Sequence, residues 1–263
     1  EEGGGVRLRR AASAPPTAAT APAPRAIARL GASFQAASPL TALTALSRLL
    51  VFRVISLGII PGLPVILFLH NRYRTTGGEE RAVEDLRWLV REHLGEDAEL
   101  LERDSAALGR PRAAAALLRG GLQPEDVAAA VRRTGARVLH AHNVNPAFGW
   151  RALAAAREAG ARVVLHLHNY RLVCAVGTCF TRGEDCTRCH GRNTVPGVRL
   201  NCRGTGPEAA VYAASLSLWQ RRMVAAADVV VVPSAFAGRR LRELGAPLRD
   251  GQVQVISHVV RDV

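Results

Sequence analysis

The feature that most constrains this chain is an alternation of predicted strands and helices that starts near residue 64 and continues to residue 257. Short apolar runs are typical of strands buried on both faces, and longer segments with apolar residues at helical spacing indicate helices. Strands alternating with helices at this spacing predict a Rossmann-like α/β domain, a parallel sheet with right-handed crossovers and helices on both faces. We predict strands at 64–70, 98–103, 136–142, 161–168, 228–234 and 252–257, and helices at 77–95, 145–160, 207–226 and 235–245, with two Ala-rich helices before residue 136.

The N-terminal part of the chain differs in character. Residues 1–47 are rich in Ala, Pro, Ser and Thr without a sustained period, which is typical of disorder. The apolar run at 49–69 contains Arg53 and a Pro-Gly-Leu-Pro break, so it is too short to cross a bilayer, and it lies too far from the N-terminus for a signal peptide. We therefore expect residues 1–62 to be an extension, which an upstream start codon could have added, and residues 63–263 to form one domain.

The chain is strongly basic, with a formal net charge of +13, and all 35 of its basic residues are arginine. A GC-rich genome, which favours arginine codons, explains this composition more readily than selection for phosphate binding does, although arginine suits phosphate geometrically. A surface of this charge favours anionic substrates or anionic lipid headgroups. Charge alone does not indicate nucleic acid.

Histidines recur where the predicted strands end, which is where open parallel sheets bind ligands. We expect His140 and His166, which lie within their strands, to be packed core residues. For His142 and His168, at the strand tips, spacing alone leaves function and packing equally open. The polar residues expected at this edge of the sheet are His70, Asn71, His140, His142, Asn143, His166, His168 and Asn169.

Gly77 and Gly78 precede a predicted helix, so their backbone N–H groups and the positive helix end could face an anion. An ordinary turn is the alternative. The pair does not form the pattern GxGxxG, and we see no acidic residue at the end of the strand at 98–103 that could bind a ribose. We therefore expect no dinucleotide cofactor.

Four motifs in order resemble the N-terminal domain of family-4 glycosyltransferases of the GT-B fold. They are "ILFLHNRYRTTGGEERAVEDL", "VLHAHN", "VVLHLHNYRLVC" with the cysteines that follow it, and "DVVVVPSAFAGRRLRELG", and the resemblance covers about residues 64–263. It implies one half of an enzyme in which two Rossmann domains face each other across a cleft. The N-terminal half mainly holds the acceptor, the other half holds the nucleotide-sugar, and transfer usually retains the anomeric configuration without a metal or other cofactor.

The resemblance also implies roles for individual residues. Gly77 and Gly78 match the loop that approaches the phosphates of the donor, and His168 matches the catalytic-site histidine near the transferred sugar. His142 and Asn143 match a strand end that lines the cleft. Asn169 is a further substrate-binding candidate, standing where many members of the family have Asp.

One departure from the family is large, because the C-terminal donor domain is absent from this sequence. We expect a hexosyltransferase that is inactive without that domain, which could be encoded separately. The expected partners are a nucleotide-sugar donor and a saccharide or lipid-linked acceptor, at the cytoplasmic face of the inner membrane with peripheral contact to anionic lipid.

All five cysteines fall within residues 174–202. A CxxC pair supplies two thiolates of a tetrahedral zinc site, and two outer cysteines could complete it. The resulting hypothesis is a structural zinc held by Cys174, Cys186, Cys189 and Cys202, which leaves Cys179 unassigned. Reduced, packed cysteines are the alternative.

A second function is also open, a basic zinc-containing module that binds nucleic acid or another anionic polymer. It fits less well, because Tyr170 and Phe180 are the only aromatic residues there that could stack on bases, and the segment lies inside a Rossmann crossover.

Overall fold

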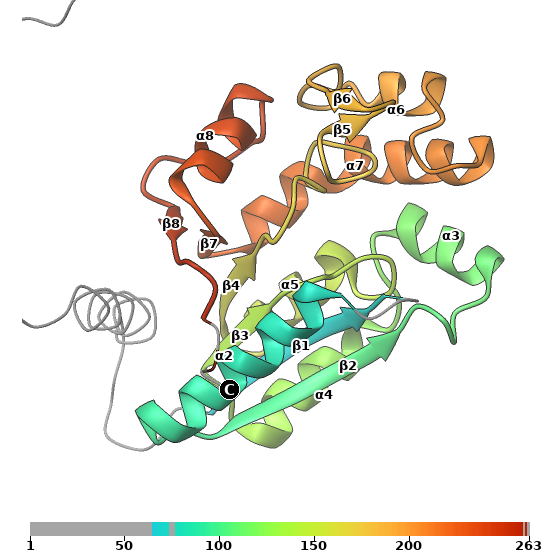
Figure 1. Ribbon diagram of the computed structural model, residues 1–263. Coiled ribbons are helices and arrows are strands. Elements are labelled where there is room, and N and C mark those ends of the chain that lie inside the picture. The colour runs from blue at the N-terminus through green and yellow to red at the C-terminus, as the bar shows by residue number, and fades with distance from the viewer. Residues whose placement is uncertain (1–64, 74–76, 260, 262–263) are drawn as a thin grey trace, which may run out of the picture. The chain divides into compact units, whose positions relative to one another are not determined.

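The computed structural model of the chain describes residues 65–73, 77–259 and 261, so the predicted extension at 1–62 lies outside the described part. A parallel sheet of six strands, in the order β2-β1-β3-β4-β7-β8, forms the centre of the fold (Figure 1). The predicted α/β fold with a Rossmann-like sheet is therefore confirmed. The strands are β1 (Ile66–Arg72), β2 (Ala98–Asp104), β3 (Val138–Ala141), β4 (Arg162–His166), β7 (Val229–Val232) and β8 (Val253–Val255).

Helices connect successive strands, as predicted. They are α2 (Gly78–Leu94), α3 (Arg110–Arg119), α4 (Pro124–Thr134), α5 (Gly149–Glu158), α7 (Gly206–Ala226) and α8 (Ala235–Glu243). Four strands end earlier than predicted, and β3 and β4 are the two that matter for the histidines, since they stop at Ala141 and His166. His142 and His168 therefore lie just beyond the carboxyl ends of their strands.

The two faces of the sheet carry separate hydrophobic cores, because side chains alternate between faces along a strand. On β1, Ile66 and Phe68 pack with α2 residues such as Val83 and Leu86. Leu67 and Leu69 point to the opposite face and belong to the core that α4, α5, α7 and α8 cover. Every one of these four β1 side chains is at most 1% exposed, so helices cover both faces.

One expectation about the second strand is wrong. β2 continues to Asp104, which pairs with Arg72 of β1, so an acidic residue does stand at the end of this strand. The pairing with β1 extends the strand one residue past the predicted end. The Asp104 carboxylate accepts a hydrogen bond from the backbone N–H of Ala106 (2.7 Å), which turns it back onto its own loop.

The cysteine-rich segment between β4 and α7 forms small elements that the sequence did not predict. They are β5 (Phe180–Thr181), which pairs antiparallel with β6 (Glu184–Asp185), and the short helix α6 (Val195–Arg199). Thr194 Oγ1 donates to the Ala213 carbonyl (2.7 Å) and Gln220 Nε2 donates to the Gly191 carbonyl (2.7 Å), which holds the segment on α7. Across the described ranges, none of the helices combines the length and apolar character needed to span a membrane.

Candidate functional site

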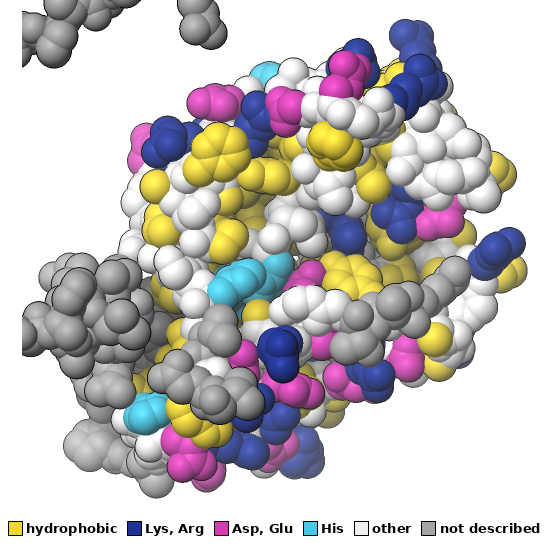
Figure 2. Space-filling model, in the orientation of Figure 1, with side chains coloured by type: hydrophobic (Ala, Val, Ile, Leu, Met, Phe, Trp, Pro, Cys, Tyr) yellow, Lys and Arg dark blue, Asp and Glu magenta, His cyan; other side chains and the backbone are white. Residues whose placement is uncertain are grey.

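Six of the eight histidines meet at the carboxyl edge of the sheet, and we call this group the histidine edge. In Figure 2 a group of histidine side chains lies near the middle of the face shown. The rings stack, with centroids 4.6 Å apart for His140 and His142 and 4.2 Å apart for His166 and His168. The histidine edge consists of His70, His140, His142, His166, His168 and His258.

The two-residue period of β-strands explains why these histidines lie on one face of the sheet. Val138 and Val164 pack in the core beneath α2, and the positions two and four residues further along β3 and β4 are histidines that face the same side. Phe68, also on this face, stacks on His140 with ring centroids 5.2 Å apart. The histidine edge is thus the continuation of an apolar stripe beyond the core.

Hydrogen bonds join the rings in pairs. His140 Nε2 lies 3.2 Å from His166 Nδ1, and His142 Nδ1 lies 2.7 Å from His168 Nε2. The other nitrogen of His168, Nδ1, lies 3.1 Å from His258 Nε2. The hydrogen bonds therefore run from buried His142 through partly exposed His168 to exposed His258.

Burial keeps four of these rings neutral at pH 7. It lowers the pKa of His140 to about 4, and burial together with neighbouring His258 lowers the pKa of His168 to about 3. The pKa values of His142 and His166 are also well below the usual value, mainly because both rings are buried. Each of these four imidazoles can donate one hydrogen bond and accept another, and the four do not act as a cluster of cations.

The structure separates the histidines that the sequence left open. His166 packs in the interior as expected, at 2% exposed, and His142 is equally buried. His140 is partly exposed and stacks between Phe68 and its histidine neighbours. His168 is also partly exposed, so of the two strand-tip histidines it is the one that a ligand can reach.

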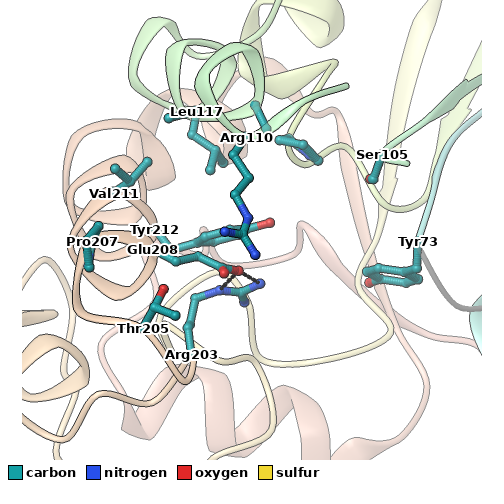
Figure 3. Close-up of a pocket in the computed structure, with 13 residues that line it drawn as sticks. Tyr73, Ser105, Arg110, Leu117, Arg203, Thr205, Pro207, Glu208, Val211 and Tyr212 are labelled. Carbon is teal, nitrogen blue, oxygen red and sulfur yellow. Dashed lines mark hydrogen bonds and ion pairs between the residues drawn. The ribbon is translucent and has the colours of Figure 1, made fainter. Parts of the chain in front are cut away.

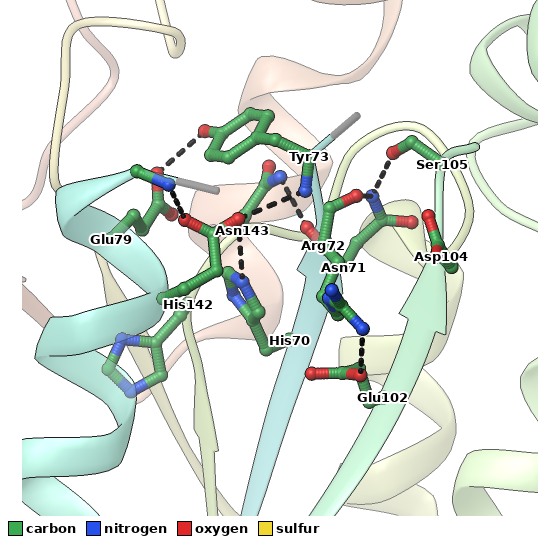
Figure 4. Close-up of polar contacts among 12 residues, drawn as sticks. His70, Asn71, Arg72, Tyr73, Glu79, Glu102, Asp104, Ser105, His142 and Asn143 are labelled. Atoms are coloured by element: carbon green, nitrogen blue, oxygen red, sulfur yellow. Dashed lines mark hydrogen bonds and ion pairs between the residues drawn. The ribbon is translucent and has the colours of Figure 1, made fainter. Parts of the chain in front are cut away.

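At the start of α2, a carboxylate of the protein occupies the place where we expected an external anion. Glu80 accepts hydrogen bonds from the backbone N–H groups of Gly77 (2.8 Å) and Tyr73 (3.1 Å), and lies 3.7 Å from His70 Nε2 (Figure 4). Burial raises the pKa of Glu80, but these amide donors outweigh it and hold the pKa below the usual value. Gly77 is therefore used by the fold itself. Gly78 remains open, because a Cβ atom there would meet no atom of the described residues within 4 Å.

Asn143 joins the ends of two strands. Its Nδ2 donates to the carbonyl of Asn71 (2.7 Å), and its own carbonyl accepts from the Asn71 backbone N–H (2.8 Å). Asn71 Nδ2 in turn donates to Ser105 Oγ (2.6 Å). The side chain that we predicted to line the cleft is 6% exposed and fixes β1 against β3.

Tyr73, which sequence reasoning did not single out, is the centre of a polar network. Its hydroxyl donates to Glu79 Oε2 (2.6 Å; Figure 4). It accepts from Arg171 Nη1 (2.7 Å), and Asn169 Nδ2 lies 3.5 Å away. Burial raises the pKa of Tyr73 and is the main cause of a raised pKa for Glu79. Asn169 also accepts from the Arg171 backbone N–H (2.9 Å), so this predicted residue helps to position the network.

On the other side of Tyr73 a pocket of about 740 Å³ opens between α3 and α7, and we call it the α3–α7 pocket (Figure 3). This volume is within the range of small-molecule sites. Apolar side chains form much of its wall, among them Ala113, Leu117, Pro146, Pro207 and Val211. Its polar groups include Tyr73, Ser105, Arg110, Arg203, Glu208 and Tyr212.

The charges in this pocket are unequal. Arg203 pairs with Glu208 (Nε to Oε1, 2.9 Å) and stacks on the ring of Tyr212, 3.6 Å from its centroid. Arg110 projects into the pocket, and no hydrogen bond or ion pair joins it to another residue of the described ranges. Two guanidinium groups against one carboxylate leave one positive charge for a ligand. Sequence reasoning missed the pocket because its residues come from surface helices far apart in the chain. The only local signal was Tyr73, directly after β1.

The five cysteines surround a small cavity of about 10 Å³. A hydrogen bond from Cys179 is the main cause that lowers the pKa of Cys174 to about 5, and the same contact raises the pKa of Cys179. Cys179, which the zinc hypothesis left out, is thus a direct neighbour of a proposed ligand. In the described part of the chain, two groups of three or more His, Cys, Asp or Glu residues have their ligand atoms within 4.8 Å of one another. Both are histidine triplets, and no cysteine belongs to either. The zinc at Cys174, Cys186, Cys189 and Cys202 stays a prediction.

Comparison with known proteins identifies the family. A crystal structure of Alr3699/HepE from Anabaena in complex with UDP is similar to the chain with 15% sequence identity and a TM-score of 0.34. The similarity covers 73% of this chain and 43% of that one, so the chain spans less than half the length of that structure. No curated protein matches the chain. A family model described as "Glycosyl transferase 4-like domain" matches residues 98–257, more than half of the chain and including the cysteine-rich segment, which argues against a separate nucleic-acid module. The chain belongs to this glycosyl transferase 4-like family.

Proposed function

We propose that this domain binds the acceptor in a glycosyltransferase that moves a hexosyl group from a nucleotide-sugar to a lipid-linked acceptor with retention of configuration. The observation that carries the proposal is the α3–α7 pocket, which lies next to the histidine edge with Tyr73 between them. The family match supports the activity. The pocket has the volume for an acceptor, and the histidine edge offers neutral hydrogen-bonding groups for the donor sugar.

The lining of the pocket favours a lipid-linked phosphate over a free saccharide. A saccharide needs many hydrogen-bonding partners, whereas much of this wall is apolar. An acyl or prenyl chain fits such a wall, and Arg110 supplies the charge for one phosphate. An acceptor of this kind resides in a membrane, and the net charge of +13 favours peripheral contact with an anionic one, such as the cytoplasmic face of an inner membrane.

On the donor side, His168 is the residue that we propose to contact the transferred sugar. Its ring is partly exposed and its pKa is lowered to about 3, so at neutral pH it presents an uncharged imidazole to a hydroxyl group or a phosphate oxygen. Gly78 leaves open space for a donor phosphate at the start of α2. The nucleotide is bound by a second domain, on the same polypeptide or a separate one, and the transfer needs no metal cofactor.

The acceptor proposal is tested by calorimetric titration of the chain with farnesyl phosphate, which joins a short prenyl chain to one phosphate. We expect binding to the unaltered protein and a Kd raised about tenfold or more in Arg110→Ala, since a hydrogen bond to a charged group contributes about 1.5–3 kcal/mol. Arg112→Ala, an exposed arginine on the same helix outside the pocket, is the matched control and should bind normally.

Two outcomes would contradict the acceptor proposal. Equal weakening in Arg110→Ala and Arg112→Ala would mean that the basic surface, not the pocket, attracts the phosphate. Binding of a neutral oligosaccharide without any response to farnesyl phosphate would assign the pocket to a free saccharide instead. Farnesol, which lacks the phosphate, separates the contribution of the apolar wall from that of Arg110.

A further inference from the structure

We propose that His166, His168 and His258 form a binding site for a divalent transition metal of the zinc class, independent of the cysteines. Each of the three rings offers a nitrogen within 4.8 Å of the others. Imidazole nitrogen is a preferred ligand of Zn²⁺ and of neighbouring metals in the series. This site goes beyond the proposed function and does not depend on it, although an ion bound to His168 would exclude the contact between that ring and the transferred sugar.

The hydrogen bonds at the histidine edge determine which nitrogens are available. The Nδ1 atom of His166 is already paired with His140, and the Nε2 atom of His168 with His142. The nitrogens left for an ion are therefore His166 Nε2 and His168 Nδ1, the second of which faces the proposed ligand His258. Rings that bind a metal usually have their second nitrogen held by a neighbouring group, and here two further histidines do this.

The distance between two of the nitrogens, and the missing hydrogen bond of the third, fit metal ligands. His168 Nδ1 lies 3.1 Å from His258 Nε2. Two ligands of a tetrahedral zinc with bonds near 2.0–2.1 Å stand about 3.3 Å apart, so a small movement of the exposed ring admits the ion. His166 Nε2 is buried without a hydrogen-bond partner in the structure, and a buried polar atom without a partner is unfavourable.

A second triplet, His140, His142 and His166, is a weaker candidate. All three of its rings lie within 16–30° of parallel, and the hydrogen bond between His140 and His166 already uses a nitrogen of each. In the proposed site His166 and His168 are stacked at 12°, but the ring of His258 is inclined by 49° to His168 and by 58° to His166. Exposure also increases from His166 to His168 to His258, which gives an ion a path from solvent and leaves a fourth position for water.

The test is a titration of metal-free chain with Zn²⁺ and with Co²⁺, whose visible spectrum reports the ligand type. His258→Ala removes the exposed ligand beyond the last strand, so the fold should persist, and we expect affinity for the histidine site to fall at least about tenfold. His93→Ala, an exposed histidine on α2, is the matched control and should bind like the unaltered chain. Cys186→Ser removes any cobalt–thiolate charge-transfer band and should leave the histidine-bound cobalt spectrum in place.

Each result decides the matter. A spectrum without thiolate character that is lost in His258→Ala and kept in Cys186→Ser supports the site. Equal affinity in His258→Ala and His93→Ala would overturn it, as would loss of all bound metal in Cys186→Ser. His168→Ala gives a second reading, because it removes another ligand from a partly exposed position and should weaken binding at least as much as His258→Ala does.

Discussion

The histidine edge and the α3–α7 pocket lie on two sides of Tyr73, and they differ in cavity volume and in the hydrogen-bonding groups they offer a ligand. The cavity beside His142, His166 and His168 measures about 30 Å³, whereas the α3–α7 pocket measures about 740 Å³. The first region holds many hydrogen-bonding rings rigidly in a site with little room. The second offers room, behind a wall that is apolar over much of its surface and carries polar groups at a few places. Under the proposed function, the reacting atoms would be positioned at the strand ends and the bulk of the acceptor would lie between the helices.

The largest expected effect comes from a substitution in the histidine edge. In a polypeptide that carries this domain together with a donor-binding domain, His168→Ala should lower transferase turnover about 100-fold, because a contact aligned with the developing charge is lost. The melting temperature should stay the same, since the ring is partly exposed. Turnover that survives, or a protein that unfolds, would make His168 a scaffold residue.

Tyr73→Phe tests the connection between the two regions. The substitution removes the hydroxyl that Glu79 and Arg171 share and leaves the aromatic wall of the pocket in place. We expect the unfolding free energy, measured in urea, to fall by about 1–2 kcal/mol. Farnesyl phosphate binding should weaken about tenfold or less, as the Tyr73 ring at the pocket wall loses the hydrogen bonds that hold it. Unchanged stability and binding would show that the two regions are independent.

Gly78→Ala sharpens the comparison with a smaller effect. A Cβ atom at this position meets no protein atom within 4 Å, so the fold should tolerate it or gain slightly in stability. If a donor phosphate approaches the start of α2, the KM for the nucleotide-sugar should rise a few-fold while the KM for the acceptor stays constant. A rise in the acceptor KM alone would place the donor phosphate elsewhere.

The smallest expected effect is a change in how stability depends on pH. Burial raises the folded-state pKa of Glu79 above its usual value of 4.5. Its contribution to stability is therefore fully present below pH 4.5 and is lost as pH rises through the folded-state pKa. Glu79→Gln should remove this loss, so unfolding free energy should decline less between pH 4.5 and neutrality. Glu84→Gln, on the exposed face of α2, should leave the decline unchanged.

Much of the fold could be predicted because its signals are local. The apolar runs of β1 and β7 and the helical spacing of α2 are visible within short windows, and the histidines after β3 and β4 follow from the strand period. The partners of the site residues are partly local and partly distant. Glu80 stands three residues after Gly77, the capping-box spacing, so this contact was a local signal that sequence reasoning overlooked. Nothing near Asn143 shows that its side chain binds the Asn71 carbonyl, 72 residues earlier.

The α3–α7 pocket was beyond such reasoning for a related reason. The sequence alone indicates that Arg110 is a solvated residue at a helix start. It gives no reason to distinguish Arg203 from the many other arginines of this basic chain. Only the packing of α3 against α7 brings their side chains to one cavity. The wrong expectation about Asp104 has a similar origin, because pairing with β1, not local composition, determines where β2 ends.

The alternation of side chains on β1 makes the two regions unequal in their capacity to diverge. His70 and Asn71 continue the same alternation as Phe68 and Leu69, so a one-residue insertion or deletion in this strand would exchange the faces of core and site together. Such a change would prevent folding, so it cannot yield a folded protein with altered activity. The helices around the pocket carry no such constraint, since substitutions on α3 and α7 alter its shape without shifting any strand pairing. If the pocket binds the acceptor as proposed, single substitutions at its wall can change the acceptor preference and leave the histidine edge unchanged.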